Sequence, residues 1–199
     1  MGHTVESSLP YRRLQQRLDR NVTGAPDSPA FMQILRLLFS PSEADLARQL
    51  PTQFTSVRSL ARKLEMTEET LDEMLTGMAE RGLVLDLAQE GRRYVALAPV
   101  VIGFFEYTFM RVRQDYPMKE LAQLFEAYLF QDERFLQSVF EGETQIGRSL
   151  VREEALPEEE FTEILDWERA SHLVESAQAH AISLCACRHH ALHADRTCD

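Results

Sequence analysis

The sequence contains no segment suited to a membrane or to secretion. Its longest apolar stretch, residues 94–110, is interrupted by Pro99, Gly103 and Glu106, whereas a spanning helix needs about 20 predominantly apolar residues. Residues 1–8 lack the apolar core of a secretory signal peptide. We therefore expect a cytoplasmic protein without membrane contact.

Positive charge is scarce as well. The 199 residues include 21 Lys and Arg against 32 Asp and Glu, which gives a formal net charge of −11. Because phosphate binding requires a positive face, this balance excludes a nucleic-acid surface spread over the whole molecule and leaves open only a local basic patch. With 44% of the residues hydrophobic, the chain has enough apolar material for a sizeable core.

Cysteine is equally rare, and its distribution is informative. The chain has three cysteines, and all of them, Cys185, Cys187 and Cys198, fall within the last fifteen residues. An odd, clustered set in a cytosolic chain indicates metal or redox chemistry more than a disulfide framework.

The hydrophobic pattern predicts a mainly α fold with a small β component. From residue 28 to 98 we expect helices near 31–38, 40–50, 56–64 and 67–80, followed by a hairpin of residues 83–87 and 92–97. Ser40 and Glu43 fit a capping box, and Ser56 and Thr67 fit the N-caps of the third and fourth helices. Two helices joined by a tight turn and followed by a hairpin are typical of a winged helix-turn-helix domain.

The remaining segments are less regular. We expect an N-terminal arm (1–27), the winged helix-turn-helix domain (28–98), a helical segment (99–148) and a small mixed α/β segment (149–199). In the arm, Leu14 and Leu18 lie on one face of a basic amphipathic helix that would pack on the next domain or on a partner subunit, with a nucleic-acid arm as the alternative. In the last segment we expect short strands at 149–151 and 163–165, a helix capped by Asp166, and a strand at 181–184 that leads into the cysteines.

The second helix of the helix-turn-helix, which would enter the DNA major groove, is acidic. Its exposed positions include five carboxylates and no basic residue before Arg81: Glu68, Glu69, Asp72, Glu73 and Glu80. DNA contacts would have to come from the preceding helix and the hairpin, through Arg58, Arg62, Lys63, Arg92 and Arg93. We therefore expect an interaction scaffold and regard DNA binding as the alternative.

A second group of residues has the chemistry of a metal site. Cys185 and Cys187 place two thiolates within reach of one metal when the backbone turns, and Cys198 would close a loop over it. Arg188 would offset the negative charge of the thiolates. A four-ligand site needs one more group, which would be His189, His190, His193 or a residue beyond the chain's end. The alternative is a set of free thiols.

These residues resemble a known family. The resemblance rests on Phe39-Ser40-Pro41-Ser42-Glu43 through the hairpin to Leu97-Ala98-Pro99, and on Ile182-Ser183-Leu184-Cys185-Ala186-Cys187-Arg188-His189 with Cys198-Asp199. The chain resembles bacterial and archaeal ferredoxin-like 4Fe-4S iron–sulfur proteins with an N-terminal winged-helix segment. The resemblance covers most of the sequence after about residue 28.

The family continues where this sequence stops. There, the Cys-x-Cys-Arg segment is followed by Cys-Asp-x-Pro-x-x-x-Cys and then by ferredoxin-type Cys-x-x-Cys-x-x-Cys repeats, whereas this chain ends at Cys198-Asp199. The resemblance implies that the chain is the N-terminal part of a longer electron carrier. It also implies a 4Fe-4S cluster, or zinc, that is held fully only in the longer protein and is empty or partial in this part.

The resulting hypothesis is an iron–sulfur electron-transfer protein whose partners are redox proteins, with a homo-oligomer as a further possibility. We see no nucleophile–base pair, phosphate loop or paired carboxylates, so we expect no catalytic residues in this chain. The first alternative is a metal- or redox-sensing winged-helix transcription regulator. The second is an interaction module with inert thiols.

Overall fold

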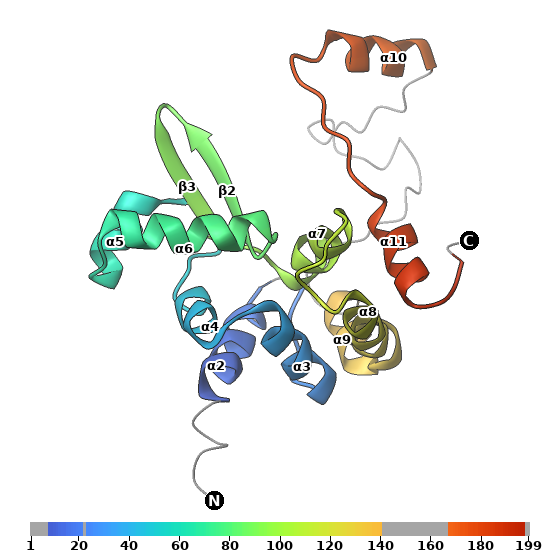
Figure 1. The fold of residues 1–199 in the computed structure, drawn as a ribbon, viewed down its shortest axis with the longest axis horizontal. Helices are drawn as coiled ribbons and strands as arrows, with labels where there is room; N and C mark the ends of the chain where they lie inside the picture. The colour runs from blue at the N-terminus through green and yellow to red at the C-terminus, as the bar shows by residue number, and fades with distance from the viewer. Residues whose placement is uncertain (1–7, 22, 141–166, 198–199) are drawn as a thin grey trace, which may run out of the picture. The chain divides into compact units, whose positions relative to one another are not determined.

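The computed structural model describes residues 8–21, 23–140 and 167–197. Within them, helices dominate and are accompanied by a small three-stranded antiparallel sheet, which confirms the predicted mainly α fold with a small β component (Figure 1). Residues 1–146 and 184–199 form one compact unit, and residues 147–183 form a second. The strands expected at 149–151 and 163–165, Asp166 and Cys198 lie outside the described residues. None of the described helices is long and apolar enough to cross a membrane.

The first unit begins with three packed helices, α2 (Leu9–Leu18), α3 (Pro29–Leu38) and α4 (Pro41–Ala47). As the sequence predicted, Leu14 and Leu18 are fully buried, and α2 packs on α3 and α4. The predicted capping box is also present, because the Ser40 hydroxyl accepts from the Glu43 amide while the Glu43 carboxylate accepts from the Ser40 amide.

The next two helices are joined by a tight turn. Helix α5 (Val57–Leu64) is capped by Ser56, and α6 (Glu68–Glu80) is capped by Thr67, as predicted. Between them the backbone turns at Glu65, which takes a left-handed conformation with φ 56°.

The hairpin that forms most of the sheet follows α6 (Figure 1). Strands β2 (Val84–Gln89) and β3 (Arg92–Leu97) form a hairpin from the Val84–Leu97 pair to the Gln89–Arg92 pair, and the two-residue β1 (Thr55–Ser56) adds to the other edge of β3. Glu90 and Gly91 both have positive φ, 51° and 70°, which is the conformation of a two-residue type I′ turn.

A second group of helices continues the core. After a kinked helical turn, η1 (Val100–Phe104), come α7 (Phe105–Phe109), α8 (Met118–Glu126), the turn η2 (Ala127–Gln131) and α9 (Glu133–Phe140). Helix α7 ends at Phe109, and Val112, which follows it, is 78% exposed. Stacking of Phe31 on Tyr128, with ring centroids 4.6 Å apart, joins this group to α3.

The predicted strand at 181–184 is wrong. Residues 181–185 are in neither helix nor strand, and Cys185 is instead the N-cap of α11 (Ala186–His193). The apolar Ile182 and Leu184 favoured a strand locally, but a strand also needs a partner to satisfy its backbone groups. Within the described ranges, only the Leu184 amide of this segment is bonded, to the Met110 carbonyl at 3.0 Å.

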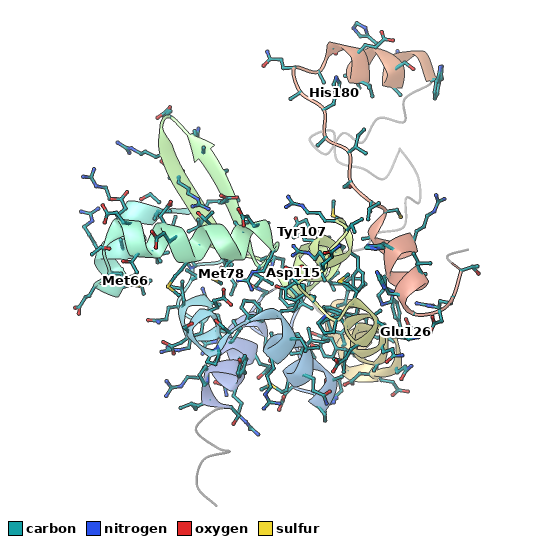
Figure 2. All side chains as sticks on the ribbon, viewed as in Figure 1. Met66, Met78, Tyr107, Asp115, Glu126 and His180 are labelled. Atoms are coloured by element: carbon teal, nitrogen blue, oxygen red, sulfur yellow. The ribbon has the colours of Figure 1, made fainter. Side chains whose placement is uncertain are left out.

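The second unit contributes α10 (Trp167–Ser176), the helix predicted there from its apolar stripe. Among its residues, Trp167, Leu173 and Val174 are all more than half exposed. His180, labelled in Figure 2, follows α10 and is exposed.

Candidate metal and redox site

The two described cysteines lie at the start of α11. Cys185 caps the helix with an extended backbone and Cys187 is its second residue; both are free thiols and both are exposed. The N-terminal end of a helix carries a partial positive charge, which favours thiolates placed there. Two thiols two residues apart therefore share an accessible, electrostatically favourable position.

His190 fixes α11 to the rest of its unit. Its side chain is 3% exposed, and its ring makes edge contacts with Phe105 and Phe109, at centroid separations of 5.4 and 5.0 Å. The ring Nε2–H donates to the Ala122 carbonyl at 3.0 Å. Burial lowers the pKa of His190, outweighing the opposite effects of the Ala122 bond and of the Glu126 charge. His190 is therefore a buried, neutral anchor of α11 whose Nε2–H is engaged by the Ala122 carbonyl.

His189 and His193, the two substitute ligands named from the sequence, face each other one turn apart on α11. Their Nε2 atoms are 3.1 Å apart, and the Nδ1–H of His189 donates to the Phe109 carbonyl at 2.8 Å. Burial, and then the charge of His189, lower the pKa of His193. The two histidines therefore contact each other on one face of α11. Their four-residue spacing is the sequence signal for this contact once the segment is a helix.

Arg188 follows Cys187 directly and is exposed. It makes no ion pair within the part of the chain that the structure describes, so its charge is available to the neighbouring thiols. Between 8 and 197, leaving out the gaps at 22 and 141–166, no three His, Cys, Asp or Glu side chains are placed to hold a metal together. Cys198 lies beyond the described residues, so the three-cysteine set stays a prediction.

The other predicted surface, around the helix-turn-helix, is only partly available. Arg93 is bonded to Asp72 at 2.9 Å and to Asp86 at 2.8 Å, and its side chain is 22% exposed. Arg93 therefore fastens the hairpin to α6, a structural role that its sequence position did not reveal.

The basic residues that remain exposed border a hollow between α5, α6 and the hairpin tip. Arg58, Arg62 and Arg92 line it together with Glu68, Glu69 and Asp72. Arg58 also approaches Glu68 at 3.9 Å, and Lys63 is exposed nearby on α5. Because guanidinium and carboxylate groups both line the hollow, it has no uniformly positive face for phosphates.

No known protein family, curated protein or solved structure matches this chain.

Proposed function

We propose that this chain is the N-terminal part of a cytoplasmic iron–sulfur electron-transfer protein, with Cys185, Cys187 and Cys198 as ligands of a 4Fe-4S cluster. The observation that carries the proposal is the pair of exposed free thiols, two residues apart, at the N-terminus of the anchored helix α11. The resemblance of the surrounding sequence to ferredoxin-like iron–sulfur proteins supports the same assignment.

The donor set fits such a cluster in part. Thiolates are its usual ligands, and two of them are exposed at the positive end of a helix. When bound, the cluster would supply one-electron transfer. The chain's own residues would place the thiols through the anchor His190, and Arg188 would offset the negative charge of the liganded thiolates. Zinc is the other metal that this donor set suits.

We interpret residues 28–98 as a winged helix-turn-helix domain that serves as a protein scaffold. Support comes from the order α5, turn, α6, β2, β3, with β1 closing the sheet. The exposed carboxylates Glu68, Glu69 and Glu73 on α6 oppose DNA, and the engagement of Arg93 removes one of its expected contacts. The partners would be redox proteins or a second copy of the chain.

Anaerobic reconstitution with iron and sulfide, followed by metal analysis and absorbance, tests the proposal. We expect poor or partial cluster retention in this chain and full retention in a longer version that includes the downstream cysteines. The matched variants are Cys185→Ser and Cys187→Ser. If the longer protein holds no metal and Cys185→Ser changes nothing, the thiols are inert. A stable, fully occupied cluster in this chain would instead mean that a fourth ligand, His189 or His193, is already present.

One observation favours a second function, a metal- or redox-sensing transcription regulator. Arg58, Arg62 and Arg92 remain exposed around the hollow beside α6 and are where such a domain meets phosphates. A regulator would bind a preferred duplex in a manner that changes when the thiols are oxidised or loaded with metal. An electron carrier would show no such coupling.

A further inference from the structure

We propose that His189 and His193 form a separate binding site for a divalent transition-metal ion, Zn²⁺ being the test ion, on the face of α11 that meets α7. The two imidazoles lie four residues apart on a helix, a spacing that stacks side chains on one face. This site uses imidazole nitrogens and does not depend on the thiols of the proposed iron–sulfur function.

The distance between the two Nε2 atoms matches the distance expected between two nitrogens that bind the same ion. Zinc binds imidazole nitrogen at about 2.0–2.1 Å, so two such ligands around a tetrahedral ion lie about 3.3 Å apart, and about 2.9 Å apart at a right angle. The observed distance between His189 Nε2 and His193 Nε2 is 3.1 Å, between these values. The spacing of the two nitrogens therefore suits a single ion bound by both, once the rings turn their lone pairs toward it.

The tautomer of His189 is set for metal binding. Its Nδ1 faces a carbonyl oxygen, that of Phe109, which can only accept a hydrogen bond, so Nδ1 carries the proton and Nε2 carries the lone pair. Metal-binding histidines commonly donate their second N–H to a backbone carbonyl in this way, which fixes the ring and its tautomer. Phe109 is fully buried, so its carbonyl is held in place.

His193 completes the pair. In the metal-free protein its Nε2–H donates to the lone pair of His189 Nε2. Binding requires that the His193 proton moves from Nε2 to Nδ1, which leaves a lone pair on Nε2 for the ion. No third His, Cys, Asp or Glu is placed to join the pair in the described ranges, so water would fill the remaining positions and the ion would stay open to a further ligand.

The test removes the thiols first. Calorimetric titration with ZnCl₂ is done on the full chain carrying Cys185→Ser, Cys187→Ser and Cys198→Ser, so that failure of the iron–sulfur proposal cannot affect the result. We expect one equivalent of Zn²⁺ to bind, with affinity at least about tenfold weaker after His189→Gln or His193→Gln. Control substitutions His172→Gln and His180→Gln, at exposed positions in the other unit, and His3→Gln should leave binding unchanged.

Two further measurements keep the proposal falsifiable if a variant folds poorly. The imidazole resonances of His189 and His193 should shift together on addition of Zn²⁺ while those of the buried His190 stay in place. Zn²⁺ should also raise the Tm of the cysteine-free chain but not that of its His193→Gln derivative. Absence of binding in the cysteine-free chain, or equal affinity after both histidine substitutions, would overturn the proposal.

Discussion

The guanidinium of Arg81, at the end of α6, forms an ion pair with Glu43, the residue that closes the capping box of α4. The same guanidinium donates to the Leu38 carbonyl at 3.2 Å and to the Gly77 carbonyl at 2.8 Å, while the Tyr116 hydroxyl donates to the same Leu38 oxygen at 3.2 Å. The ends of α3 and α6 and the start of α4 therefore meet at one charged group.

Removing the charge of Glu43 should destabilise this junction. Burial by itself would raise the pKa of Glu43, but bonds from Arg81 and from the Ser40 amide, together with the Arg81 charge, lower it. For Glu43→Gln we expect a loss of about 2 kcal/mol in the free energy of unfolding at neutral pH, because the Arg81 guanidinium is left without its partner.

The pH dependence of that loss follows from the lowered pKa. Stability from Glu43 is complete above its unfolded pKa of about 4.5 and is lost as the pH falls through the lower folded value. The difference between wild type and Glu43→Gln in urea denaturation should therefore shrink in that range. An equal difference at low and neutral pH would contradict the prediction. The control is Asp45→Asn, which removes a carboxylate whose side chain is 49% exposed and which pairs with Arg48.

Two glycines on either side of the α6 terminus should respond to alanine in opposite directions. Gly82 has φ +76°, and an added Cβ would lie 2.4 Å from the Cβ of Tyr107, which Figure 2 labels. We expect Gly82→Ala to cost about 2–4 kcal/mol of unfolding free energy from backbone strain and the clash. Gly77, inside α6 with open space around it, is the matched control: Gly77→Ala should stabilise by about 0.5–1 kcal/mol. Thermal denaturation of both variants measures this, and a neutral Gly82→Ala would refute it.

The buried histidine should make stability depend on pH in the neutral range. Because the folded pKa of His190 lies below its unfolded value of about 6.5, the folded state binds fewer protons, and its contribution is complete above that value and declines as the pH falls below it. Among nearby ionisable groups, Glu126 raises the pKa of His190, whereas Arg196 and His193 lower it further.

We expect the unfolding free energy to fall between about pH 7.5 and about pH 5.5, and to fall less in His190→Gln, whose amide can still donate to Ala122 but does not titrate. Urea denaturation at both pH values measures the difference. Identical pH profiles for the two proteins would show that His190 does not titrate in this range, and His180→Gln, at an exposed position, should behave as wild type.

The surface formed by α5, α6 and the hairpin should not select a DNA sequence. With Glu68, Glu69 and Glu73 exposed on α6 and Arg93 held by two carboxylates, we expect no sequence-specific duplex binding at physiological salt. Selection from random duplexes followed by a mobility-shift assay provides the measurement. Nanomolar binding to one preferred sequence that is lost after Arg92→Ala combined with Arg93→Ala would contradict it.

Local signals predicted the fold well where they were strong. Ser40 and Glu43 correctly predicted the start of α4, because a capping box depends only on neighbouring residues. Ser56 and Thr67 likewise predicted the N-caps of α5 and α6. The strand at 181–184 failed because pairing depends on a partner elsewhere in the chain.

The candidate site was predictable in its residue types and not in its geometry. The roles of His190 and Arg93 depend on Phe109, Ala122 and Asp72, which lie far away in the sequence. Cys185 and Cys187 could be identified from their spacing alone. The contact between His189 and His193 depends on this segment being a helix, α11, which the sequence did not predict.

The C-terminal helix is attached through main-chain oxygen atoms. The Leu184 amide, His189 Nδ1 and His190 Nε2 reach the carbonyls of Met110, Phe109 and Ala122, and every residue type offers a carbonyl. Replacing the side chain of Met110 or Ala122 with another of similar size would leave these bonds intact, whereas replacing either histidine with a residue that has no side-chain donor would break one. Part of the attachment of this helix therefore depends on main-chain groups that any residue in α7 or α8 would supply, whereas the ring contacts of His190 with Phe105 and Phe109 require those two aromatic side chains.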